Sequence, residues 1–110
     1  MYAITEGVAK INDRKVHAFK REVFAGDAIL TVKAGTTGYK GEVCRKDSCR
    51  TFVCLESILG DVHFTPITDP EGCMTGFQIV GCGDDALNAL VRAVKFVEKV
   101  LDEQRLGYND

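Results

Sequence analysis

A row of polar and basic residues runs through the C-terminal part of the chain. Asn88, Arg92, Lys95 and Lys99 follow one another at steps of four, three and four residues, so on a helix they share one face. Guanidinium and ammonium groups in such a row donate charge-assisted hydrogen bonds to phosphate or carboxylate oxygens. A solvated helix face produces the same pattern, and this alternative stays open beside anion binding.

A glycine-rich segment is a second candidate for anion recognition. Residues 34–41 read AGTTGYKG and hold three glycines, two hydroxyls, an aromatic ring and a lysine. Glycines let a ligand approach backbone N–H groups, and successive N–H groups form concave nests that bind phosphate. The candidate second anion site comprises Gly35, Thr36, Thr37, Gly38 and Arg50. An ordinary glycine-rich hairpin loop is the alternative.

Residue types that perform catalysis do not form a recognisable motif. The sequence has no P-loop, no dinucleotide-binding glycine motif, no nucleophile elbow and no HExxH pair. The adjacent Asp84 and Asp85 fall at the start of a predicted helix, where the helix dipole explains them. We therefore expect no enzymatic activity and no cofactor.

The cysteine pattern favours reduced thiols. The chain contains five cysteines, which are Cys44, Cys49, Cys54, Cys73 and Cys82. An odd number without a secretory leader fits free thiols better than a disulfide framework. No C-x-x-C or H-x-x-x-H pair provides the usual spacing of zinc ligands. We expect no metal site, and on its strand Cys54 is predicted to pack as a small apolar residue.

The composition indicates one globular domain that spans residues 1–110. The chain has 110 residues and a mass of 12.0 kDa, with 45% hydrophobic and 27% charged residues. A net charge of −2 argues against a protein that coats DNA, and no apolar run is long enough to span a membrane. Residues 2–7 lack the basic and apolar regions of a leader, which predicts a cytoplasmic protein.

The pattern of apolar residues predicts an α+β fold. Strand-like runs and turns fill residues 2–81, and residues 84–106 form one helix. The short connections predict an antiparallel meander, with the helix packed on the sheet. A tight hairpin is expected at residues 59–61. A turn is expected at residues 69–72, where Pro70 presets the second position and Gly72 accepts a positive φ.

The helix carries more apolar surface than one contact requires. Its seam, at alternating steps of three and four, is Leu87, Leu90, Val94, Val97 and Leu101. Ala86, Ala89, Ala93 and Val100 widen the apolar face. At about 1.5 Å per residue the helix is roughly 33 Å long. We expect this length to be more than one small sheet can cover. A helix that is apolar on more than one side needs a second surface, so residues 86–101 are predicted to mediate a homodimer or higher homo-oligomer.

Three residues carry a resemblance to a known family. Phe77 lies on the strand that feeds the helix, Asn88 lies early in the helix, and Arg105 follows seventeen residues later. Together with the order of the elements, an N-terminal antiparallel sheet followed by a C-terminal helix, these three residues resemble the first family of phage anti-Thoeris sponge proteins. The resemblance implies a phage protein of the host cytoplasm that sequesters cyclic ADP-ribose isomers made by bacterial defence. Arg21 is similar to a further family arginine.

The resemblance thus implies immune evasion by a non-enzymatic sponge that binds a cyclic nucleotide signal. Its ligand-binding residues are then Phe77, Asn88, Arg105, Arg21 and Arg92. Some family members form hexamers and bind cyclic oligonucleotides at a second site, for which the segment around Gly35 is the candidate. No membrane or DNA partner is expected. A protein–protein inhibitor or adaptor of phage or mobile-element origin, and a small cyclic-nucleotide hydrolase, are the alternatives.

Overall fold

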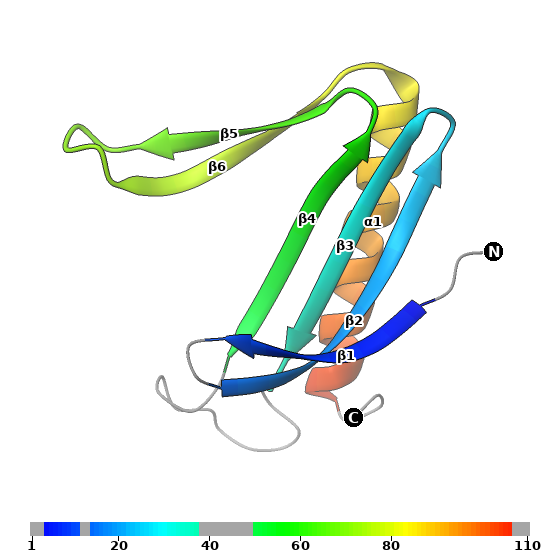
Figure 1. Ribbon diagram of the computed structural model, residues 1–110, viewed down its shortest axis with the longest axis vertical. Coiled ribbons are helices and arrows are strands. Elements are labelled where there is room, and N and C mark those ends of the chain that lie inside the picture. Colours follow the sequence, from blue (N-terminus) through cyan, green and yellow to red (C-terminus); the bar gives the residue numbers. More distant parts are fainter. Residues whose placement is uncertain (1–3, 12–13, 38–49, 107–110) are drawn as a thin grey trace.

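The computed structural model describes residues 4–11, 14–37 and 50–106, which form two sheets and one helix (Figure 1). The main sheet contains β1 (Ile4–Ile11), β2 (Arg14–Ala25), β3 (Ala28–Thr36) and β4 (Thr51–Leu59). A separate two-stranded arm contains β5 (Val62–Thr68) and β6 (Met74–Gly81). The helix α1 (Gly83–Arg105) follows directly. The predicted α+β class is confirmed.

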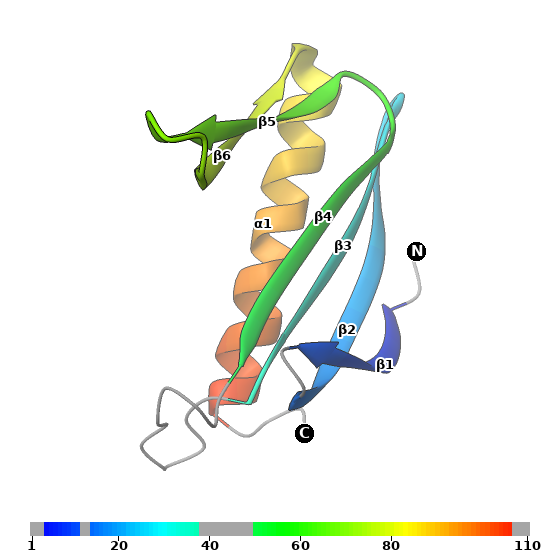
Figure 2. The ribbon, with the colours of Figure 1, turned by 60° about the vertical axis from the view of Figure 1, so that its left-hand side comes forward.

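The four strands of the main sheet pair in chain order, and every pair is antiparallel. This confirms the meander for β1–β4. Figure 2 shows α1 along one face of this sheet. The turn between β2 and β3 is attached to the start of the helix, because the Asp27 backbone N–H donates to the Asp85 carboxylate at 3.0 Å.

Small residues form most of the contact between α1 and the sheet. The buried helix residues are Ala86, Ala89, Ala93, Phe96, Val100 and Gln104. They pack with buried sheet residues such as Phe19, Val23 and Leu30. Because alanine is short, the helix backbone can lie close to the strands at native packing density.

The expectation that the helix outruns the sheet is wrong. Buried positions occur along α1 from Ala86 to Gln104, and β2 and β3 run beside it over twelve and nine residues (Figure 1). Strands rise about 3.3 Å per residue against about 1.5 Å in a helix, so nine strand residues match some twenty helical ones. Among the described residues, no helix is long and apolar enough to cross a membrane.

The predicted apolar seam does not form the buried face of the helix. Leu87 and Val94 are 59% and 62% exposed. Leu90, Val97 and Leu101 are half-buried at the margin of the core. The alanines that were expected only to widen the seam instead make the central contact. The helix is therefore apolar on two sides, as its composition predicted.

The β5–β6 arm departs from the predicted meander. The tight hairpin expected at residues 59–61 is wrong, because β5 pairs with β6 and not with β4. Gly60 there has a φ of 107°, and Val62 begins β5 opposite Gly81. The burial of Val62 in the main core fixes the base of the arm.

The turn at the tip of the arm is confirmed. The Asp69 carboxylate accepts hydrogen bonds from the backbone N–H groups of Glu71 at 3.0 Å and Cys73 at 2.9 Å. Gly72 has a φ of 90°, a left-handed conformation that glycine adopts without steric cost. The arm thus has a well-defined tip although it extends away from the main sheet (Figure 1).

A buried glutamine holds the last turn of α1 against the sheet. Gln104 is 1% exposed. Its Oε1 accepts from the Thr36 backbone N–H at 2.9 Å, and its Nε2 donates to the His17 carbonyl at 2.8 Å. One side chain therefore satisfies backbone groups of β2 and β3 at the end of the sheet.

Replacement of Gln104 by leucine should destabilise the protein. The change leaves the Thr36 N–H and the His17 carbonyl without this partner, and each unsatisfied buried group costs about 1–3 kcal/mol. We expect a loss of about 2–4 kcal/mol in the free energy of unfolding, measured by urea denaturation. The exposed Glu98→Gln is the control and should change stability by less than about 0.5 kcal/mol. Equal stability of both variants would contradict this role.

Candidate functional site

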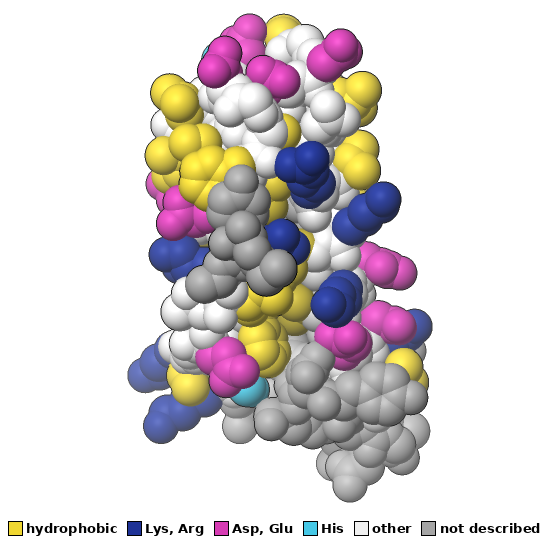
Figure 3. All heavy atoms as spheres, turned by 90° about the vertical axis from the view of Figure 1, so that its right-hand side faces the viewer, with side chains coloured by type: hydrophobic (Ala, Val, Ile, Leu, Met, Phe, Trp, Pro, Cys, Tyr) yellow, Lys and Arg dark blue, Asp and Glu magenta, His cyan; other side chains and the backbone are white. Residues whose placement is uncertain are grey.

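A cationic pocket of about 270 Å³ lies between α1 and the strands β1 and β2. Four cations line it, which are Arg21, Arg92, Lys95 and Lys99. The apolar part of the lining is Ile4, Val23, Phe24 and Phe96. Figure 3 shows Lys and Arg side chains gathered around hydrophobic ones on this side of the molecule. No carboxylate is among the described residues that line the pocket.

The strand periodicity explains the position of Arg21. Successive side chains on a strand point to opposite faces, and Phe19 and Val23, two residues before and after Arg21, are buried in the core under the helix. Arg21 therefore belongs to the helix-facing side of β2, at the margin of the core. Its Nε is buried and has no hydrogen-bond partner.

The helix supplies the other three cations from consecutive turns. Arg92 donates from one guanidinium nitrogen to the Phe24 carbonyl at the end of β2. Lys95 and Lys99 line the same pocket further along α1. Like charges that converge without a lining carboxylate repel one another, so the pocket favours an anion. Phe96 closes the inner side of the pocket as part of the core, and Phe24 contributes its backbone carbonyl.

The structure brings together two of the five predicted ligand-binding residues. Arg21 and Arg92 line the cationic pocket, as do Lys95 and Lys99 from the predicted polar row. Asn88 is exposed on α1 and does not line this pocket. Phe24 and Phe96 were not predicted to line the pocket, since their pattern indicated only strand and core positions.

Phe77 and Arg105 lie elsewhere. Phe77 on β6 is 56% exposed and lines an apolar cleft on the other side of the helix. Arg105 at the end of α1 is exposed and forms a salt bridge with Asp102, with its Nε 2.8 Å from the carboxylate. Within one copy of the chain, Phe77, Asn88 and Arg105 do not line a common pocket among those described.

The residues of the predicted second anion site are engaged with one another where they are described. A Cβ on Gly35 would lie 2.6 Å from the His17 carbonyl oxygen, which gives this glycine a packing role. The Thr37 N–H donates to the Arg50 carbonyl at 3.0 Å, and the Arg50 N–H donates to the Thr37 hydroxyl at 3.0 Å. The hydroxyl of Thr36 bonds that of Thr51 at 2.7 Å.

These bonds close the β3–β4 ladder at the point where the glycine-rich segment begins. Gly38 and the rest of that segment lie outside the described residues. Anion binding at this site therefore stays a prediction, with a structural role established for Gly35, Thr36 and Thr37.

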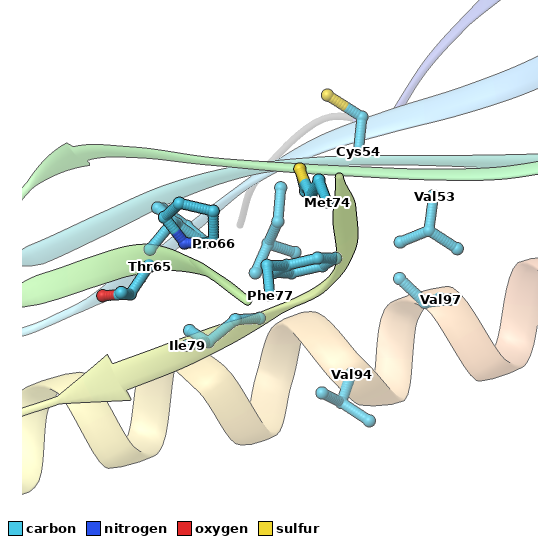
Figure 4. A pocket seen from close by; sticks show the side chains of 11 residues that line it. Val53, Cys54, Thr65, Pro66, Met74, Phe77, Ile79, Val94 and Val97 are labelled. Carbon is cyan, nitrogen blue, oxygen red and sulfur yellow. The ribbon is translucent and has the colours of Figure 1, made fainter. Parts of the chain in front are cut away.

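The apolar cleft has a volume of about 630 Å³ and is larger than the cationic pocket. Its walls come from β4, the arm and α1, with Val53 and Cys54 on β4 and Val94 and Val97 on the helix. In Figure 4 the ring of Phe77 projects into the space between the arm and β4. The prediction that Cys54 packs inside the protein is wrong, because this residue is exposed at the cleft.

The other cysteines give no metal site among the described residues. Cys73 and Cys82 are free and exposed, while Cys44 and Cys49 lie outside the described ranges. In the described part of the chain, no three His, Cys, Asp or Glu side chains lie together as a metal site requires.

Comparisons with known proteins place the chain in no family. No family model matches it, and neither a curated protein nor a solved structure does. The chemistry of the pocket and the cleft therefore rests on the residues themselves.

Pyrophosphate should raise the melting temperature of the protein. An anion that binds only the folded state stabilises it by about 1.4 kcal/mol at ten times its Kd, which corresponds to a shift of roughly 5 °C or more for a domain of this size. We expect this shift by scanning calorimetry at constant ionic strength, and we expect Arg21→Gln to remove most of it. The neighbouring exposed Lys20→Gln is the matched control. Equal shifts in both variants would contradict the pocket as the anion site.

Proposed function

We propose that this protein binds and sequesters a small cyclic nucleotide signal, such as a cyclic ADP-ribose isomer. The single observation that carries the proposal is the cationic pocket, where four cations converge without a lining carboxylate among the described residues. Phosphate groups complement the cations, and the apolar part of the lining complements the less polar part of a nucleotide. The resemblance to anti-Thoeris sponges supplies the cyclic ADP-ribose class and the role in immune evasion.

Arg21 carries the hydrogen-bond donor that a bound phosphate should pair with most directly. Among the described residues its buried Nε has no hydrogen-bond partner, and a buried donor without a partner costs about 1–3 kcal/mol. A phosphate oxygen would replace that cost with a charge-assisted bond. Arg92 is already held by the Phe24 carbonyl, so its guanidinium is oriented before the ligand arrives.

Sequestration fits this pocket better than turnover. Its described lining contains no carboxylate, imidazole, hydroxyl or thiol, the groups that most often act as general bases or nucleophiles. Lysine and arginine hold phosphates in place. The hydrolase alternative therefore has weaker support, and the adaptor alternative draws on the exposed apolar cleft instead.

Phe77, Asn88 and Arg105 fit the proposal only if two copies of the chain share a ligand. Asn88 and Arg105 are separated by about 26 Å along α1 and by roughly 100° around it, beyond the reach of one small nucleotide. The half-exposed ring of Phe77 provides a stacking surface on the arm. A homodimer would bring these residues from different copies to one site.

The direct test of the function is calorimetric titration with cyclic ADP-ribose isomers and cyclic oligonucleotides. We expect one of these compounds to bind the wild type, and Arg21→Ala to weaken binding by roughly ten- to a hundredfold. Lys33→Ala, an exposed charge on β3, is the control. After heat denaturation, mass spectrometry should recover the ligand unchanged. A converted product would favour the hydrolase, and no binding at all would contradict the sponge.

A second titration tests the residues outside the cationic pocket. Arg105→Ala should weaken binding by roughly ten- to a hundredfold through a lost charged hydrogen bond. Phe77→Ala should weaken it similarly, since stacking on an aromatic ring contributes about 1–3 kcal/mol per base. If Arg21→Ala alone reduces affinity, the ligand occupies the cationic pocket and the assignment of Phe77 and Arg105 fails.

A further inference from the structure

One face of the β5–β6 arm is apolar and exposed. Phe64 lies opposite Ile79 in the register of the arm, and Pro66 lies opposite Phe77, so these side chains share one face. Phe64, Ile79 and Phe77 are 38%, 37% and 56% exposed. We call these three residues the apolar arm face. They line the cleft seen in Figure 4.

The helix presents a second apolar surface beside the cleft. Leu87, Val91 and Val94 follow at steps of four and three, which places them along one side of α1. They are 59%, 43% and 62% exposed. These residues, the outer helix stripe, lie away from the alanines that pack on the sheet.

The arm lacks the support that a two-stranded sheet needs. Among the described strands, β5 and β6 pair only with each other, and Figure 1 shows them extending away from the main sheet. A two-stranded hairpin is marginally stable in water unless a further strand or a helix covers its apolar face. The arm therefore needs a partner surface that the described residues of this copy do not provide.

The exposed apolar area matches what one partner contributes to a stable interface. The apolar arm face, the outer helix stripe, Met74 and Val53 comprise eight large side chains that are each 37–63% exposed. An aromatic side chain buries about 150–250 Å² and an aliphatic one less, so the eight present on the order of 600 Å². One side of a standard interface contributes about 800 Å², and a patch above about 600 Å² is unusual on a monomer.

We propose that the partner is a second copy of this chain, whose arm enters the cleft beside the helix. The same surface carries a protruding apolar arm and an apolar hollow, and a two-fold axis pairs each protrusion with the other copy's hollow. Such an exchange covers the apolar arm face and the outer helix stripe in both copies at once. It differs from a contact through the helices alone, which would leave both arms uncovered.

A small apolar molecule would not cover the same surface. The cleft holds about 630 Å³, but Leu87 and Val91 are not among the residues that line it. A ligand confined to the cleft would leave these side chains in water. A second copy reaches both regions because its own apolar residues extend over arm, strand and helix.

The first experiment measures the mass of the protein in solution without added ligand, by light scattering between 1 and 100 µM. We expect about twice the 12.0 kDa of the monomer, and at least a tenfold rise in the dissociation constant for Val94→Glu and for Met74→Glu. Val8→Glu on β1 is the matched control, because Val8 is 69% exposed against 62% for Val94. Circular dichroism checks that each variant folds.

The outcomes separate arm exchange from its alternatives. A wild type that stays at 12.0 kDa overturns the proposal. Loss of the dimer in Val94→Glu but not in Met74→Glu indicates a helix contact and also overturns it. If the variants do not fold, the wild-type protein still tests the proposal. Isotope-filtered NMR should then show contacts between the Phe77 ring of one copy and the Val94 methyls of the other, and their absence would overturn arm exchange. No nucleotide is present in this test, and the cationic pocket lies outside the exchanged surfaces, so failure of the arm exchange leaves the anion site unaffected. The two proposals compete only for Phe77, whose ring the second copy would cover.

Discussion

The close contact between α1 and the main sheet is the constraint on which the other features depend. Ala86, Ala89 and Ala93 face the strands and are at most 1% exposed. Because their side chains are short, the first half of the helix lies near the sheet and leaves little room for larger groups there. In the second half the larger Phe96, Val100 and Gln104 fill the contact. Most bulky residues of the helix are therefore turned to its two sides, where they meet different strands.

The two sides of the helix have opposite chemistry. Arg92, Lys95 and Lys99 face the side of β1 and β2, where Arg21 completes a cationic pocket. Val94 and Val97 face the side of β4 and the arm, where the walls are apolar. One helix can thus contribute to an anion site and to an apolar interface without placing charges in the interface, where an unpaired charge would be costly.

Polar contacts at the two ends of the helix keep these faces in register. Asp85 accepts a hydrogen bond from the β2–β3 turn near the start of α1, and Gln104 bonds both β2 and β3 at its end. A shift of one residue would rotate the helix by about 100° and turn the cationic and apolar sides away from the strands that they now face. The position of Arg92 relative to Arg21 therefore depends on contacts about one turn from each helix end.

The sequence by itself determined the α+β class, the order of strands in the main sheet, the turn at Asp69–Gly72 and the helix, since these follow from local periodicity and turn chemistry. It also placed Arg92, Lys95 and Lys99 on one face. Only the tertiary structure decided that alanines meet the sheet, that β5 and β6 form an arm, and that Arg21 joins the helix cations while Phe77 lies across the molecule. Apolar residues extend around much of α1, so hydrophobicity alone could not select its buried face; contacts with strands distant in the chain selected it.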